Sequence, residues 1–269
     1  MVGETMENLY EEYQAQKKLL IEALVEKDHM EMYESNLLKN DFVLKLGEPR
    51  YELHKLELTI ARTKLKLDLM QTCIKLQIPI DTEQIDKQLE KEFEKHDSML
   101  KSMKREIDNA HDPSNNSIVI LQNTQQLKEL YFSISSYVHP ELVDNYDKNL
   151  KRIWKATKKA YQGGDTPKLK RLQKKVLNEY NDLSNRDRSD SNLEDIILTM
   201  KEKTKGVLIE IEGLKKQFPF NEAKMLEDEE AVVKFRKEID VDIKIANELL
   251  DKLEKQILEK LPSPGRYIN

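Results

Sequence analysis

The feature that most constrains this chain is an apolar pattern of helical period that runs far longer than a β-strand. Between residues 50 and 77, apolar side chains recur at every seventh position: Leu53, Ile60, Leu67 and Ile74. The same segment alternates over short stretches, so a strand is arithmetically possible. Strands, however, run about 4–8 residues, and strong helix formers fill the positions between these apolar residues. The segment therefore predicts a long helix.

The composition indicates long helices throughout the chain. Of the 269 residues, 35% are charged and 6% are aromatic, and there are 7 glycines and 8 prolines. An α/β enzyme needs more glycine for its turns and more β-branched residues for its strands, whereas abundant Lys and Glu are typical of coiled coils. We therefore expect an all-α, elongated fold, in which long antiparallel helical hairpins, coiled-coil-like, flank a smaller helix–loop–helix segment.

Residues 1–112 are expected to form an N-terminal module of three long helices. The first helix should end at Gly47 and Pro49, because glycine suits a C-terminal cap and proline cannot continue a helix. The second helix should end near residue 77, and Asp81 is placed to cap the third. The second and third helices should form an antiparallel hairpin, with the first packed alongside.

Residues 185–269 are expected to form a C-terminal antiparallel coiled-coil hairpin. Apolar residues recur at alternating spacings of four and three over 193–218, which is the pattern of a coiled-coil seam. A second stripe of similar length covers 232–253, and Pro219 lies in the break between them. Two seams joined by a short turn favour pairing with each other. Such seams permit a monomer and a homodimer alike.

The central segment, 113–184, follows a linker rich in Pro, Ser and Asn. The helical run 126–138 precedes the tripeptide His139-Pro140-Glu141, and a second helical run follows it. This order resembles the centre of a J-domain, the module through which DnaJ-type co-chaperones engage Hsp70 and whose loop reads His-Pro-Asp. The resemblance extends over about a fifth of the chain, to Tyr180.

The resemblance implies a DnaJ-like co-chaperone or adaptor. His139, Pro140 and Glu141 would contact an Hsp70-type chaperone, and the long helices would select a protein client that the sequence does not name. The chain departs from the family pattern in three ways. Glu141 replaces Asp, the helix before the loop has no Lys or Arg over 132–138, and the family's first helix has no counterpart before residue 126. The alternative is a non-enzymatic coiled-coil scaffold with a decayed J-domain.

The segment after the tripeptide is strongly basic, although the whole chain has a net charge of −5. From 145 to 175 there are 11 Lys and Arg against two Asp. We call these eleven cations the basic face: Lys148, Lys151, Arg152, Lys155, Lys158, Lys159, Lys168, Lys170, Arg171, Lys174 and Lys175. The first six are predicted to dock an acidic protein partner. A plain solvated surface is the alternative, and nucleic acid is less favoured because no aromatic residues interleave with these cations.

The sequence contains no motif for phosphate binding or for metal binding. No glycine-rich phosphate-binding loop occurs, and neither the five histidines nor Cys73 has metal-ligand spacing. We expect no enzymatic activity, no cofactor and no metal. No stretch approaches 18 uncharged apolar residues, and the acidic start of the chain lacks the apolar core of a secretory signal. The expectation is therefore a cytoplasmic protein with no membrane segment.

Overall fold

The fold is all-α, as the sequence predicts. The computed structural model describes residues 2–112, 124–143, 146–180 and 193–260, and these contain helices and turns with no strand. The predicted linker after residue 110 and the predicted break after residue 184 lie largely or wholly outside the described residues.

The chain divides into two compact units, and each unit combines segments that are distant in sequence. The first unit comprises Met1–Lys39 and Ser117–Asn221, and the second comprises Asn40–Asn116 and Glu222–Asn269. The expected division was into three consecutive modules, 1–112, 113–184 and 185–269. The structure therefore groups the helices differently from their order along the chain.

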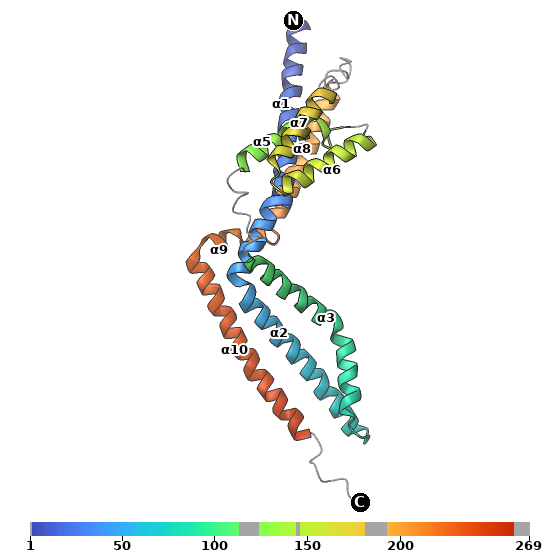
Figure 1. The fold of residues 1–269 in the computed structure, drawn as a ribbon, viewed down its shortest axis with the longest axis vertical. Helices are drawn as coiled ribbons and strands as arrows, with labels where there is room; N and C mark the ends of the chain where they lie inside the picture. Colours follow the sequence, from blue (N-terminus) through green and yellow to red (C-terminus); the bar gives the residue numbers. More distant parts are fainter. Residues whose placement is uncertain (1, 113–123, 144–145, 181–192, 261–269) are drawn as a thin grey trace, which may run out of the picture. The chain divides into compact units, whose positions relative to one another are not determined.

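In the first unit, α1 (Val2–His29) packs in parallel with α8 (Leu193–Lys215) (Figure 1). Ion pairs join them in the same order along both helices: Glu12 with Lys201, and Lys27 with Glu210. Their apolar side chains share one core cluster: Leu20, Ala23, Leu24, Met30, Val207 and Ile211. The stripe on α8 that predicted a coiled-coil seam is thus buried against α1.

The J-like segment packs on another face of α1. It consists of α5 (Thr124–Val138), α6 (Lys148–Gln162) and α7 (Thr166–Tyr180). The core of these three helices includes Ile21 and Val25 of α1. The segment therefore shares its hydrophobic core with the N-terminal helix.

The second unit is built around α2 (Ser35–Lys75), with α3 (Thr82–His111) and α10 (Glu229–Lys260) beside it (Figure 1). The predicted hairpin of α2 and α3 is present, and the Asp81 carboxylate caps α3 by accepting the backbone N–H of residue 84 at 2.9 Å. Two short helices, η5 (Phe220–Glu222) and α9 (Ala223–Glu227), precede α10.

The predicted pairing of 193–218 with 232–253 is replaced by two other pairings. The stripe of α8 packs on α1, and the stripe of α10 packs on α2 in a cluster containing Leu56, Ile60, Leu67, Ala246 and Leu253. The physical reason is that a seam fixes which face of a helix is buried, but not which helix covers it. Short connection length favoured the nearest stripe, and apolar burial is satisfied equally well by a distant one.

The predicted helix end at Gly47 and Pro49 is wrong, because both residues lie inside α2. A Cβ atom at Gly47 would lie 3.1 Å from Cγ1 of Ile107 in α3. Glycine therefore allows α3 to approach α2 closely, which is a packing role and not a capping role. Pro49 costs the helix one backbone hydrogen bond, and the burial of neighbouring side chains such as Leu46 offsets that cost.

Candidate functional site

The tripeptide of the J-like segment forms a turn directly after α5. The backbone N–H of Leu142 donates to the carbonyl oxygen of His139 at 3.0 Å, which closes the turn. The side chain of His139 is buried, with 4% of the residue exposed, whereas Pro140 and Glu141 are exposed. We call residues 139–142 the J-like loop. Of its three predicted contact residues, two present their side chains to solvent.

The ring of His139 is fixed on three sides. Its Nδ1 accepts the backbone N–H of Glu141 at 3.2 Å, so a neutral ring carries its proton on Nε2. Nε2 faces Oδ2 of Asp28 at 3.4 Å, and the ring meets the Trp154 ring edge-on with centroids 4.7 Å apart. The histidine therefore acts from inside the core to set the backbone of the loop.

Asp28, near the end of α1, holds α5 as well as the loop. The hydroxyl of Tyr131 donates to Oδ2 of Asp28 at 2.7 Å, and both residues are buried. The pKa of Tyr131 is held far above its ordinary value, because burial disfavours the phenolate and the Asp28 carboxylate repels it. Tyr131 is therefore a permanent hydrogen-bond donor to Asp28.

The next residue, His29, contacts the far end of α6. Its Nδ1 is hydrogen-bonded to the hydroxyl of Tyr161, and its Nε2 lies 3.1 Å from Oε1 of Glu34. The hydrogen bond from His29 lowers the pKa of Glu34. Burial, together with the charge of Glu34, raises the pKa of Tyr161. Tyr161 stacks on Tyr131 with ring centroids 4.3 Å apart, so the two sets of contacts adjoin.

A π-helical turn, η1 (Met30–Glu34), makes the contact between His29 and Glu34 possible. In an α-helix, neighbours on one face are three or four residues apart, and these two residues are five apart. The wider π turn bonds residues five apart, and such turns occur often at functional sites. We use the name buried polar cluster for the residues joined by these contacts, of which Glu34 alone is partly exposed: Asp28, His29, Glu34, Tyr131, His139 and Tyr161.

A second support for the J-like loop comes from α8. The Nζ of Lys203 donates to the carbonyl oxygen of Glu141 at 3.0 Å. The loop is therefore held from within by Asp28 and at the surface by Lys203, and both supports lie outside the J-like segment. The carboxylate of Glu141 stays exposed at the turn.

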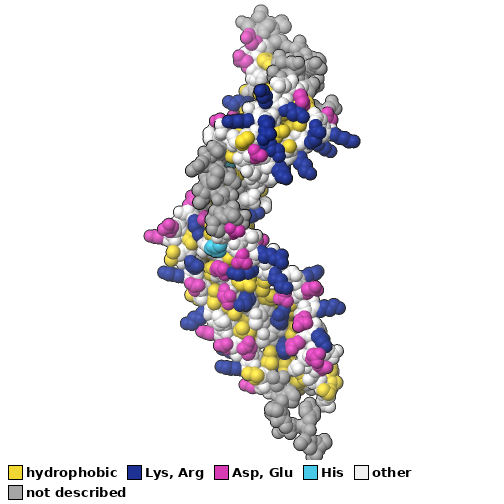
Figure 2. Space-filling model, viewed as in Figure 1, with side chains coloured by type: hydrophobic (Ala, Val, Ile, Leu, Met, Phe, Trp, Pro, Cys, Tyr) yellow, Lys and Arg dark blue, Asp and Glu magenta, His cyan; other side chains and the backbone are white. Residues whose placement is uncertain are grey.

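The basic face follows this loop along the chain, on α6 and α7. Figure 2 shows Lys and Arg side chains gathered over these two helices. Lys148, Lys151, Arg152, Lys155 and Lys159 are exposed, and Lys158 is half-buried. Within the described part of the chain, Lys175 is the one member in an ion pair, with Glu179 at 3.7 Å. Most of this positive charge is thus free of neutralising partners among the described residues.

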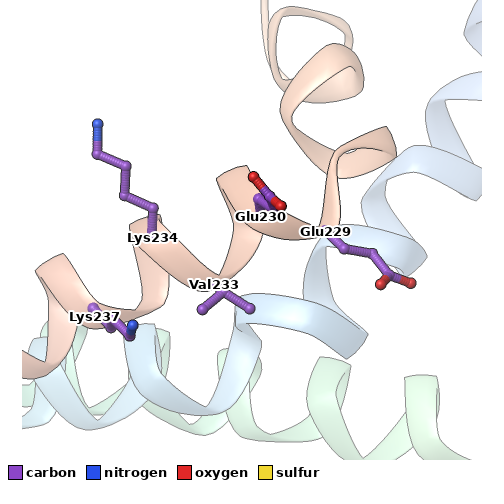
Figure 3. Close-up of a pocket in the computed structure, with 5 residues that line it drawn as sticks. All are labelled: Glu229, Glu230, Val233, Lys234 and Lys237. Carbon is purple, nitrogen blue, oxygen red and sulfur yellow. The ribbon is translucent and has the colours of Figure 1, made fainter.

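Two surface hollows lie in the second unit, away from the loop. One is lined by Glu229, Glu230, Val233, Lys234 and Lys237, all from the first turns of α10, with Lys234 pointing away from its neighbours (Figure 3). The other lies between α2 and α3 and contains both His54 and His96. Among the described residues, no group of three or more His, Cys, Asp or Glu side chains is placed to hold a metal ion.

Comparisons with known proteins add no relative: no family model, no curated protein and no solved structure matches the chain. Within the residues that the structure describes, no helix is both long and apolar enough to cross a membrane.

Six residues of the site were not predicted from the sequence as site residues: Asp28, His29, Glu34, Tyr131, Tyr161 and Lys203. One signal was present, because Asp28 stands four residues after Leu24, at a position that continues the apolar stripe of the first helix. A carboxylate on a buried stripe requires a partner in the core. The identity of that partner could not be read from the local pattern.

Proposed function

We propose that this protein is a DnaJ-like co-chaperone or adaptor that engages an Hsp70-type chaperone through the exposed side chains of Pro140 and Glu141. One observation carries the proposal. The J-like loop exposes these two residues, while the buried His139 and the Lys203 amine hold the backbone on either side of Glu141. A turn held in this way loses little conformational entropy when a partner binds.

Glu141 supplies the chemistry of recognition. Its exposed carboxylate can accept a charge-assisted hydrogen bond from a cationic side chain of the partner, worth about 1.5–3 kcal/mol. The carboxylate of Glu lies about one C–C bond further from the backbone than that of Asp. Because the loop backbone is held at both sides, we expect a cognate Hsp70 whose cationic group fits the longer side chain.

The basic face supports the proposal through long-range electrostatics. Its cations on α6 and α7, most of them in no ion pair with a described residue, attract an acidic surface and raise the rate of encounter, an effect that salt weakens. Under this proposal the family's basic contribution comes from the two helices after the loop, since the helix before it has no Lys or Arg over 132–138.

The test is ATP turnover by the cognate Hsp70 in the presence of the full chain. We expect the wild-type chain to stimulate turnover, and Glu141→Gln to raise the concentration needed for half-maximal stimulation about tenfold or more, through loss of the charged hydrogen bond. Glu202→Gln, an exposed carboxylate on α8, is the matched control and should behave as wild type. No stimulation by the wild-type chain would contradict the proposal.

The same assay tests the basic face. The double variant Lys155→Glu with Lys159→Glu should weaken stimulation and make it less sensitive to salt, because the steering charge is reversed. Lys244→Glu with Lys252→Glu changes the net charge equally at exposed positions of α10, and should leave the salt dependence close to wild type. If the two double variants have equal effects, the basic face is not part of the docking surface.

The alternative function, a coiled-coil scaffold with a decayed J-domain, is supported by a different observation. Apolar side chains on α10 are solvent-exposed, among them Val241 at 57% and Ile245 at 58%. Such exposure suits association with another helix or with a client. If wild type fails to stimulate Hsp70 and Glu141→Asp restores stimulation, this alternative replaces the first.

A further inference from the structure

We infer that Asp28 of α1 is a positioning residue for the J-like loop, so that recognition through this loop depends on the N-terminal helix and not on α5–α7 alone. This inference rests on the proposed function for its biological meaning. Its structural claim is that the Asp28 carboxylate sets the tautomer of His139, and that this tautomer in turn holds the backbone at Glu141. This claim can be tested without any partner.

The neighbours of His139 fix which of its ring nitrogens donates a hydrogen bond and which accepts one. A neutral imidazole has one donor nitrogen and one acceptor nitrogen. The backbone N–H of Glu141 can only donate, and it points at Nδ1 from 3.2 Å. Nδ1 is therefore the acceptor, and Nε2 must carry the proton.

The other ring nitrogen, Nε2, faces Asp28. Oδ2 of Asp28 lies 3.4 Å away and accepts the hydroxyl of Tyr131 at 2.7 Å. A carboxylate accepts and does not donate when ionised, so Asp28 selects the ring tautomer with the proton on Nε2. That tautomer leaves Nδ1 free to accept the N–H of Glu141. Through this hydrogen bond, Asp28 fixes the position of the loop backbone.

The ring has little freedom to rearrange. His139 is 4% exposed, and the Trp154 ring meets it edge-on. Solvent therefore does not replace a lost contact, and an unpaired buried donor is costly. Removing the carboxylate should leave the Nε2 proton without an acceptor, allow the other tautomer, and place two donors against each other at Nδ1 and the N–H of Glu141.

The test uses the full chain and nitrogen NMR of labelled histidine, with amide hydrogen exchange at Glu141 and Leu142. In the wild type at neutral pH we expect one tautomer of His139, protonated on Nε2. Asp28→Ala should produce a mixture of tautomers and speed exchange at both amides about tenfold or more. Asp28→Asn keeps an acceptor oxygen and should restore most of the wild-type behaviour.

Two further variants separate positioning from general weakening of the core. Tyr131→Phe removes the hydrogen bond from Tyr131 to Asp28 but leaves the carboxylate that faces Nε2 of His139, and should keep the tautomer. Glu22→Gln changes an exposed carboxylate on the same helix and should change neither readout. If Asp28→Ala leaves the tautomer and the two exchange rates at wild-type values, Asp28 is not a positioning residue.

The wild-type spectrum alone can also overturn the inference: His139 protonated on Nδ1 at neutral pH contradicts it, whether or not any variant folds. Hsp70 turnover then separates the two proposals. Altered tautomer and exchange in Asp28→Ala, with no stimulation by wild type, would sustain the positioning role and reject the co-chaperone function. If wild type stimulates Hsp70 while Asp28→Ala keeps the wild-type tautomer and exchange rates, the co-chaperone function would stand and the positioning role of Asp28 would be rejected.

Discussion

At the scale of single residues, the chain concentrates its buried polar groups in one unit. Among the described residues, the buried polar and charged residues other than tyrosine all belong to the first unit: Asp28, His29, Ser35, Ser135, His139, Thr157 and Thr166. Buried polar groups are costly unless they are hydrogen-bonded. Asp28, His29 and His139 each make a hydrogen bond, whereas the hydroxyl of Thr166 has no hydrogen-bond partner among the described residues. The hydrogen-bonded groups form a network that favours one arrangement of the core over others. The J-like loop is attached to this network through His139.

The two buried tyrosines of the cluster predict a loss of stability at alkaline pH. The pKa values of Tyr131 and Tyr161 are raised in the folded protein, so their contribution to stability is fully present below the unfolded-state pKa of about 10. It is lost as pH rises above that value, by about 1.4 kcal/mol per pH unit for each tyrosine. Urea unfolding at several pH values above and below 10 measures this slope.

Tyr131→Phe should make the alkaline slope shallower by about one tyrosine's share. Tyr51→Phe, a change on a half-buried ring of α2 outside the cluster, is the control and should keep the slope of the wild type. An unchanged slope in Tyr131→Phe would show that Tyr131 ionises as readily in the folded chain as in the unfolded one.

The sequence predicted the residues of the loop but not the burial of His139. The tripeptide is recognisable because its three members are adjacent, and its exposed part, Pro140 and Glu141, lies at the turn as expected. The buried ring of His139 faces Asp28 at 3.4 Å, and Tyr131, which donates to the same carboxylate, lies 103 residues from it in sequence. Contacts at that separation leave no periodic signal, so a single sequence does not reveal them.

At the scale of elements, helical period predicted the helices well and their ends less well. The hairpin of α2 and α3 has its predicted cap at Asp81, where a side chain bonds a nearby backbone N–H. Gly47 and Pro49 misled because their local preference for a helix end is overridden by packing on α3. Propensity is a weak prior wherever burial is available.

Two glycines within helices predict different responses to alanine. At Gly206, inside α8, a Cβ atom meets nothing within 4 Å, so Gly206→Ala should raise the free energy of unfolding by about 1 kcal/mol through helix propensity. At Gly47 the new atom would press on Ile107 and Val43 at 3.1 Å, so Gly47→Ala should gain less or lose stability. Urea unfolding followed by circular dichroism compares them, and equal gains would contradict the packing role of Gly47.

At the scale of the whole molecule, the two compact units are assembled from interleaved segments of the chain. The apolar pattern of the sequence predicted which faces of the helices are buried. It did not predict that α8 pairs with α1 and α10 with α2, because several apolar stripes could have covered each face. The consequence for function is that the J-like segment shares its core with α1 and takes a surface bond from α8. The conformation of the loop therefore depends on α1 and α8 of the first unit as well as on α5, α6 and α7.

The most direct test of the account is an amide hydrogen-exchange footprint of the full chain with ATP-bound cognate Hsp70. We predict protection at residues 139–143 and along α6, with little change along α10. Adding Glu141→Gln at the same concentrations should remove most of that protection. Protection confined to α10, or none in the presence of Hsp70, would contradict the claim that Pro140 and Glu141 of the J-like loop are the contact with the chaperone.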